Sequence, residues 1–294
     1  MHLIGVGEIL WDLIGASEYL GGAVLNFCVQ SSRLGHQVSF VSAVGDDARG
    51  HLALARAHQL GLSTRFVRTV PEAATGIVTV TVDPGGQPSY VIHRPAAYDF
   101  AVLDAADFVA LSTPAPDWIA FGTLQSMAPP ARRLVQSVIE HFPHARRFYD
   151  VNLRRDSYTP ELVADLLKQA HVVKLNDGEV EQVQHMLHTS EPNLEAFCRA
   201  YVARFGYQAL CVTRGSEGCA LMLDGQYLEV PGYSVTVADT VGAGDAFAAA
   251  LLHGIQAGWP AREVADFANR LGALVASRKG GTPEWSLAEL ERIQ

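Results

Sequence analysis

Short apolar runs and amphipathic segments alternate along most of the chain. Apolar runs of strand length are followed by segments whose apolar residues recur every three or four positions, which is typical of helices packed on a sheet. The expected strands are residues 3–6, 38–43, 148–151, 172–175 and 210–213. The expected helices are residues 23–34, 50–59, 160–168, 177–185, 194–205, 243–257, 261–277 and 287–293. This alternation predicts an α/β fold, with a central, mostly parallel β-sheet flanked by helices on both faces.

Two β-rich stretches interrupt the alternation. Residues 75–82 and 89–93 flank Asp83-Pro84-Gly85-Gly86, which is a hairpin signal, and residues 9–14 form a third strand candidate. We expect these parts to build a small antiparallel sheet beside the main core, although the hairpin could instead extend the main sheet. No repeat, low-complexity tract or flexible linker is apparent, so we expect one domain over residues 1–294.

Composition and charge narrow the class of protein. The 294 residues are 49% hydrophobic and 18% charged, which excludes a disordered chain. The net charge of −9 argues against a nucleic-acid partner, because phosphate backbones require a basic face. No apolar run is long enough to span a bilayer, and residues 1–7 lack the basic start of a signal peptide. The four cysteines show no C-x-x-C spacing and predict free thiols in a reducing cytoplasm: Cys28, Cys198, Cys211 and Cys219.

The clearest chemical motif is Asp239-Thr-Val-Gly-Ala-Gly-Asp245, which precedes an apolar helix. Gly242 and Gly244 leave backbone amides open where a helix begins, and such amides favour an anion. A carboxylate there would repel a bound phosphate, so Asp245 makes sense as a base that deprotonates a nucleophile attacking that phosphate. The alternative is a helix-capping turn without chemistry.

A second motif, Gly21-Gly-Ala-Val-Leu-Asn26, opens an earlier helix. Paired glycines allow close approach of a ligand, and Asn26 can both donate to and accept from hydroxyl groups. Asp12 is a lone carboxylate in an apolar strand, where sugar hydroxyls would satisfy it. The alternative is a tight turn with Asp12 facing solvent.

Three further strand ends carry polar residues: Asp150-Val-Asn-Leu-Arg154, Lys174-Leu-Asn-Asp-Gly-Glu179 and Thr213-Arg-Gly-Ser-Glu-Gly218. Ligands of open α/β sheets bind at such ends, so these segments indicate a nucleotide platform. Gly215 and Gly218 could instead simply form a hairpin turn. The chain has no G-x-x-x-x-G-K-[ST] loop, and Gly5-Val-Gly7 lacks the third glycine of a dinucleotide fingerprint, which disfavours P-loop and Rossmann enzymes.

Together the two glycine motifs resemble the signatures of the ribokinase-like (PfkB) carbohydrate kinases, and the resemblance extends over nearly the whole chain. It implies a ribokinase-like core with a discontinuous β-sheet lid, formed by about residues 9–20 and 74–98. It also implies ATP-dependent phosphorylation of a sugar hydroxyl. A non-catalytic sugar-binding module on the same fold is the alternative class, which Asp245 argues against.

The resemblance assigns roles by position. Asp245 matches the catalytic base, and three residues match the anion hole: Gly242, Ala243 and Gly244. Three more match acceptor-binding positions: Asp12, Gly22 and Asn26. Asn176 and Glu179 match the N-x-x-E element that organises Mg²⁺ and phosphate through water. The remaining matches are to the nucleotide site: Thr213, Gly215, Gly218 and Asn269.

Other features bear on the acceptor and on ions. The opening Gly-Glu-x-x-x-Asp, the Gly-Gly-Ala-x-x-Asn helix start and Arg94-Pro-Ala-Ala-Tyr-Asp99 look most like bacterial fructokinases. Arg94 is expected to reach a sugar hydroxyl or a sugar carboxylate, which leaves 2-keto-3-deoxygluconate kinase, or a kinase of another sugar or of a nucleoside, as the alternative. Ala23 stands where ribokinase resembles Gly-Gly-Lys, so ribose is disfavoured. Asp239 with residues 279–281 resembles a K⁺ site, although Val241 replaces a usual threonine.

The expected lid also bears on assembly. A sheet this small cannot bury both of its faces, so one face should either pair with a second chain or remain partly solvated. We therefore expect a homodimer formed through the lid.

Overall fold

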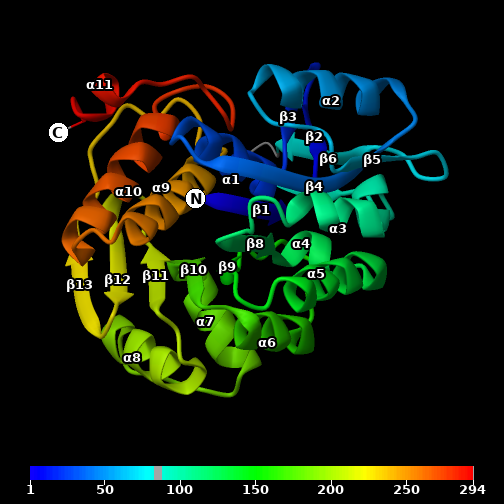
Figure 1. Ribbon diagram of the computed structural model, residues 1–294. Helices are drawn as coiled ribbons and strands as arrows, with labels where there is room; N and C mark the ends of the chain where they lie inside the picture. The colour runs from blue at the N-terminus through cyan, green and yellow to red at the C-terminus, as the bar shows by residue number, and fades with distance from the viewer. Residues whose placement is uncertain (83–87, 294) are drawn as a thin grey trace.

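Nine strands form one sheet through the middle of the molecule in this computed structural model, which describes residues 1–82 and 88–293 (Figure 1). Their order is β13 (Gln226–Val230), β12 (Cys219–Leu223), β11 (Ala209–Thr213), β10 (Val172–Asn176), β9 (Arg146–Asp150), β8 (Trp118–Gly122), β1 (His2–Val6), β4 (Gln37–Gly45) and β5 (Val67–Val70). Neighbours from β5 to β11 are parallel, and β12 and β13 are antiparallel. The expected mostly parallel sheet is confirmed.

Helices cover both faces of this sheet (Figure 1). One core includes residues of α1 (Ala23–Arg33), α2 (Ala48–Gln59), α9 (Ala243–Ala257) and α10 (Ala261–Ala276). The other includes residues of α3 (Ala105–Leu111), α5 (Pro129–His141), α6 (Pro160–Gln169), α7 (Asp177–Met186) and α8 (Leu194–Phe205). Two single-turn helices, α4 (Thr123–Ser126) and α11 (Leu287–Leu290), complete the set, with 3₁₀ turns at Ala97–Phe100 and Gly215–Glu217.

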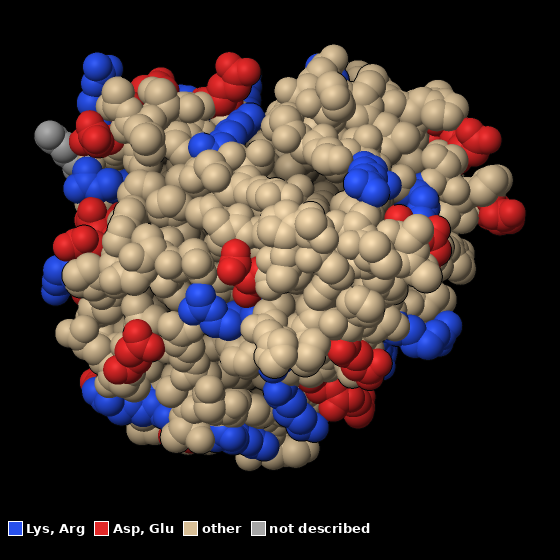
Figure 2. Space-filling view, viewed as in Figure 1, with Lys and Arg blue, Asp and Glu red and all other residues tan. Residues whose placement is uncertain are grey.

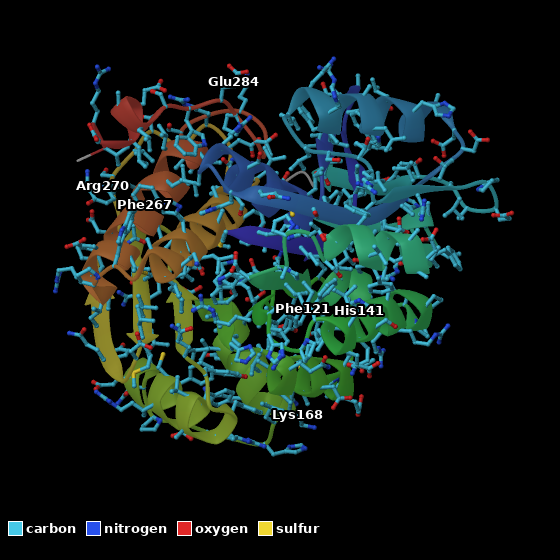
Figure 3. All side chains as sticks on the ribbon, in the orientation of Figure 1. Phe121, His141, Lys168, Phe267, Arg270 and Glu284 are labelled. Atoms are coloured by element: carbon cyan, nitrogen blue, oxygen red, sulfur yellow. The ribbon has the colours of Figure 1, made fainter. Side chains whose placement is uncertain are left out.

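Successive strand residues face opposite cores, as the pleat requires. Phe148 packs with α1 and α9, whereas its neighbour Tyr149 packs on the other side, where its ring stacks on Phe121 with centroids 5.5 Å apart. Phe121 lies in the interior of Figure 3, while Lys168 and Glu284 lie at the surface. Double-sided burial explains why these strands appear as continuous apolar runs in the sequence.

A second, four-stranded sheet lies beside the first, in the order β3 (Ser17–Gly21), β2 (Leu10–Ile14), β6 (Gly76–Val82) and β7 (Pro88–Ile92). We call these four strands the lid. The β6–β7 pair is antiparallel, as expected, and β3, a strand that was not predicted, pairs antiparallel with β2. The expectation that the whole lid is antiparallel was wrong, because β2 and β6, which join its two halves, are parallel, with Leu10 opposite Gly76. The expected hairpin turn at residues 83–86 lies outside the described residues.

Among the described residues, no helix is long and apolar enough to cross a membrane. All four cysteines are buried free thiols. On the face shown in Figure 2, acidic and basic side chains are interspersed rather than separated into patches.

Candidate active site

A cavity of about 410 Å³ lies between the lid and the carboxyl ends of the central strands. The ends of β8, β9, β10 and β11 reach it through Gly122, Asp150, Asn176 and Thr213. Crevices at this end of a parallel sheet are the usual ligand sites of open α/β folds. Eight of the site residues expected from the sequence line it: Asp12, Gly22, Asn26, Asn176, Thr213, Gly242, Gly244 and Asp245.

Asp245 lies in the first turn of α9 and is buried, with 9% of its surface exposed. Its Oδ2 accepts a hydrogen bond of 2.8 Å from Nδ2 of Asn26 on α1. Burial raises the pKa of Asp245 to about 7, against the opposing effect of the Asn26 hydrogen bond. A carboxyl group with a pKa near neutrality can accept a proton from a hydroxyl group and release it afterwards, as a general base must.

Gly242 and Gly244, the two glycines before Asp245, are glycine for different physical reasons. Gly242, the residue before α9, has φ of +78°, and a Cβ there would lie 2.2 Å from the carbonyl oxygen of Gly281, so the fold itself demands glycine. At Gly244 a Cβ would make only an ordinary contact, 3.5 Å from Nζ of Lys174. The absence of a side chain at Gly244 therefore leaves room in the cavity and does not relieve a steric clash. Gly244 also lies beside the free amides at the positive end of α9.

Asp12 projects from the lid strand β2 into the same cavity. Burial raises the pKa of Asp12 to about 6; the charge of Arg154 opposes this shift, and those of Asp239 and Glu8 add to it. A Cβ at Gly21 would lie 2.6 Å from Oδ2 of Asp12, so glycine at this position makes room for the carboxylate. Asp12 thus lines the same cavity as Asn26 and Asp245, with oxygens able to accept from hydroxyl groups.

Asn176 and Glu179 form a capping box at the start of α7. Oδ1 of Asn176 accepts from the amide of Glu179 at 3.0 Å, and Oε2 of Glu179 accepts from the amide of Asn176 at 2.8 Å. Oε1 of Glu179 accepts from the amide of Leu153 at 2.6 Å. Glu179 is 3% exposed and does not line the cavity, whereas Asn176 does, so this pair fits an ion held through water and not one coordinated directly.

A buried ion pair joins the ends of β9 and β10. Nζ of Lys174 lies 3.1 Å and 3.0 Å from the two carboxylate oxygens of Asp150. Burial alone would lower the pKa of Lys174, but the charges of Asp150, Glu179 and Asp245 raise it, so the ammonium group stays charged. Sequence reasoning placed Lys174 only within a strand end of the expected nucleotide platform and gave it no role of its own, although a lone cation in an apolar strand is a visible signal.

Arg154 is a second residue that sequence reasoning placed in the expected nucleotide platform without a role of its own. It follows β9, lines the cavity and makes no ion pair within 4.0 Å in the described part of the chain. Its charge lowers the pKa values of four acidic groups: Glu8, Asp12, Asp150 and Asp245. The cavity therefore has a cation available to an anionic ligand.

Arg94, expected to contact the acceptor, does not line this cavity. Its guanidinium donates to the carbonyl oxygen of Leu124 at 2.7 Å and pairs with Asp99, and it lies over the ring of Tyr98. These contacts fix the segment that follows β7 against α4. Arg94 is thus engaged by protein groups and lies outside this cavity, and its contact with the acceptor stays a prediction.

Several other expected site residues serve the scaffold near the cavity. Nδ2 of Asn269 donates to the carbonyl oxygens of Val230 and Pro231, at 3.3 Å and 3.2 Å. Gly215 and Gly218 form the turn between β11 and β12, so the hairpin alternative holds for the local structure. The amide of Ala243 donates to the carbonyl oxygen of Thr240 at 3.3 Å.

Asp239 joins the turn that precedes α9 to the turn at Gly280. Its Oδ1 accepts from the amide of Val241 and its Oδ2 from the amide of Gly280, each at 3.0 Å. The second turn supplies Gly281, which packs against Gly242. Within residues 1–82 and 88–293, no three His, Cys, Asp or Glu side chains are grouped to hold a metal ion directly.

The chain is similar over almost its full length to proteins named as sugar kinases. It is 29% identical to an uncharacterized sugar kinase of Pyrococcus horikoshii, over 99% of this chain and 94% of that protein. The structure of that kinase in complex with ATP matches with a TM-score of 0.81, covering 96% of this chain and 95% of that one. A fructokinase of Klebsiella pneumoniae is 30% identical, over 94% of this chain and 93% of its own length.

A third likeness extends to a different acceptor class. A 2-dehydro-3-deoxygluconokinase of Thermotoga maritima matches with a TM-score of 0.84 at 20% identity, over 99% of this chain and 98% of that one, which shows the shared fold. Residues 13–287 match the pfkB family of carbohydrate kinases. Because this match spans most of the chain and the relatives are sugar kinases by name, this chain belongs to the pfkB family and is an ATP-dependent carbohydrate kinase.

Proposed function

We propose that this protein transfers the γ-phosphoryl group of ATP to a hydroxyl group of a free hexose, with fructose as the acceptor. The observation that carries the proposal is the placement of Asp245, whose carboxyl group accepts from Asn26 in a cavity that Asp12, Gly242 and Gly244 also line. Relatives named fructokinase, at 29–30% identity over at least 93% of the chain, support the choice of acceptor.

In the proposed reaction, Asp12 and Asn26 hold the acceptor by hydrogen bonds to its hydroxyl groups. Asp245 accepts the proton of the attacking hydroxyl group as its oxygen bonds to phosphorus, which lowers the barrier for a weak nucleophile. The amides of Gly242 and Gly244, with Ala243 between them, stabilise charge on the transferred phosphoryl group. Mg²⁺, held through water by Asn176 and Glu179, would neutralise charge on the nucleotide phosphates, with ATP lying towards Thr213, Gly215, Gly218 and Asn269.

In this proposal the lid excludes water from the site of phosphoryl transfer. The inward side chains of β2, β6 and β7, including Leu10, Val78 and Ile92, line the cavity. Apolar groups over the transfer site keep water from competing with the sugar for the phosphoryl group. We also propose K⁺ near Asp239, residence in the cytoplasm and a homodimer formed through the lid.

A sugar acid is the second candidate acceptor, and Arg154 favours it. This arginine offers a cation to the cavity, and a carboxylate would pair with a guanidinium group well. Arg154 is a better candidate for that contact than Arg94, since Asp99 and Leu124 engage Arg94.

An acceptor panel tests the proposal. ATP-coupled turnover should be measured with fructose, 2-keto-3-deoxygluconate, ribose and adenosine. The proposal expects the highest kcat/KM with fructose, and the second candidate expects it with ketodeoxygluconate. The Arg154→Met variant would separate the two candidate acceptors if its KM for fructose equals that of wild type while its turnover of the sugar acid is lost.

A further inference from the structure

The helix that carries Asn26 begins without a capping side chain of its own. The residue before α1 is Gly22, with φ of +123°, and a Cβ there would lie 2.3 Å from the carbonyl oxygen of Glu8. Neither Ser, Thr, Asp nor Asn can stand at this position without strain, although these are the usual caps. The free amides of the first turn must therefore find a partner elsewhere in the chain.

Glu8 supplies that partner. It follows β1 by two residues, has 2% of its surface exposed, and its Oε1 accepts from the amide of Ala23 at 2.7 Å. Burying a carboxyl group is costly unless hydrogen bonds compensate it, and the positive end of a helix compensates it further. Glu8 thus fixes the first turn of α1 to the end of the central strand β1.

The first turn of α1, which Glu8 holds, also carries Asn26, the partner of Asp245. The amide of Asn26 donates to the carbonyl oxygen of Gly22 at 2.9 Å, which makes Asn26 the first residue bonded inside α1. Its side chain then donates to Asp245 at 2.8 Å. Glu8, Gly22, Asn26 and Asp245 all line the same cavity. A shift of the first turn of α1 would therefore move Asn26 relative to both the acceptor and Asp245.

We propose that Glu8 is a positioning residue for phosphoryl transfer: by capping α1 from outside the helix, it holds Asn26 against Asp245 and the acceptor. The inference rests on the proposed function for its kinetic consequence. Its structural half, the clamp on α1, is independent of which sugar is the acceptor.

The test compares two substitutions of Glu8 in the full-length protein. Glu8→Gln keeps a side-chain oxygen that can accept from Ala23, so kcat/KM for the acceptor should stay within about threefold of wild type. Glu8→Met has a similar length and no such oxygen, so kcat/KM for the acceptor should fall by about 10²-fold, because small misplacements of reacting groups are costly. The KM for ATP should change little in either variant.

Asn193→Ala is the matched control. Asn193 caps α8 by accepting from the amide of Ala196 at 2.9 Å, and it does not line the cavity. Its loss should lower the melting temperature and leave both KM values and kcat unchanged. If Glu8→Met behaved in the same way, with lower stability and unaltered kinetics, Glu8 would be only a structural cap and the inference would be overturned.

Amide hydrogen exchange over the first turn of α1 gives a readout that needs no acceptor. Glu8→Met should lose protection there and Glu8→Gln should retain it; equal protection in both variants would overturn the clamp. Wild-type turnover on the acceptor panel is measured first. A wild type inactive on every acceptor refutes the proposed function, whereas an active wild type matched by Glu8→Met refutes only the role of Glu8.

Discussion

Nδ2 of Asn26 donates to Oδ2 of Asp245 across 2.8 Å, although 219 residues separate the two in sequence. The bond joins the first turns of α1 and α9, so the two glycine motifs of the sequence meet at one point. Each motif alone is compatible with a simple helix start. Their contact, in a cavity that Asp12 also lines, is what the proposed transfer of a phosphoryl group to a hydroxyl group requires.

Gly244 gives a prediction in which stability and activity move in opposite directions. Gly244→Ala introduces a Cβ that meets only Nζ of Lys174, at 3.5 Å, so the protein should fold and gain up to about 1 kcal/mol, because alanine favours the helix. The same methyl group narrows the anion-binding turn, so the KM for ATP should rise and kcat should fall. Melting curves and steady-state kinetics on one preparation check this.

Gly242→Ala is the contrasting variant. With φ of +78° and a backbone oxygen 2.2 Å from the new Cβ, it should lose stability as well as activity. If Gly244→Ala also melted well below wild type, the glycine would be required by the fold rather than by the ligand.

Asp12 should serve the acceptor and not the nucleotide. Asp12→Ala removes charge-assisted hydrogen bonds to hydroxyl groups, each worth roughly 1.5–3 kcal/mol when buried, so the sugar KM should rise at least tenfold. ATP binding should be nearly unchanged, as measured by calorimetry. Loss of ATP affinity with intact sugar affinity would show that the two ends of the cavity have been exchanged.

The pH dependence of turnover should follow Asp245. Burial raises the pKa of Asp245 to about 7, and a base acts in its deprotonated form. The kcat/KM for the acceptor should therefore rise with pH through about 7 and then level off. A profile that stays flat from pH 5.5 to 8.5 would count against Asp245 as the base.

The same pKa has a consequence for stability with a definite sign. The folded-state pKa of Asp245 lies above its ordinary value of 3.8, so its contribution to stability is fully present below about pH 4 and is lost as pH rises through about 7. Asp245→Asn cannot ionise. Its melting temperature, compared with wild type, should therefore improve between pH 5 and pH 8.

The oligomeric state can be predicted from the lid. Tyr19 is 44% exposed on the face of the lid that also carries Asp12 and Ile14, and Val91 is 50% exposed on the opposite face, so neither face of this small sheet is fully buried. We expect a homodimer through the lid, seen by sedimentation at micromolar concentration, and a monomer in either the Tyr19→Glu or the Val91→Glu variant, whichever face is the interface. A wild-type monomer would contradict this interface.

The sequence pattern predicts many elements of the central sheet and its helices, but few features of the lid. Helices α8 and α9 begin and end where predicted, because Asn193 caps the first and glycines bound the second. Strand β3 was not predicted, since Ser17–Gly21 is largely exposed and gives no apolar run. Parallel pairing of β2 with β6 depends on contacts between segments about 65 residues apart, which local pattern cannot specify.

In the candidate site, too, some residues could be identified from the sequence and others could not. Asp245, Asn26 and Asp12 were recognisable because each interrupts a glycine-rich or apolar pattern. The contacts of Lys174 with Asp150 and of Arg94 with Asp99 were not, because a charged side chain in sequence does not reveal which partner it will meet. Arg94 is an example: its place in the motif suggested a contact with the acceptor, whereas in the structure it pairs with the carboxylate of Asp99.

The most direct test of the account is the turnover of Asp245→Asn. The substitution keeps the size of the side chain and its contact with Asn26 but removes the base, so kcat should fall by about 10²–10⁴-fold with a smaller change in acceptor KM. A capping role alone would instead cost about 1 kcal/mol of stability and leave activity largely intact. A variant that is folded by its melting curve, and turns over slowly by this factor, is the result predicted here. A folded variant with near-wild-type kcat would remove Asp245 from the chemistry and contradict the account.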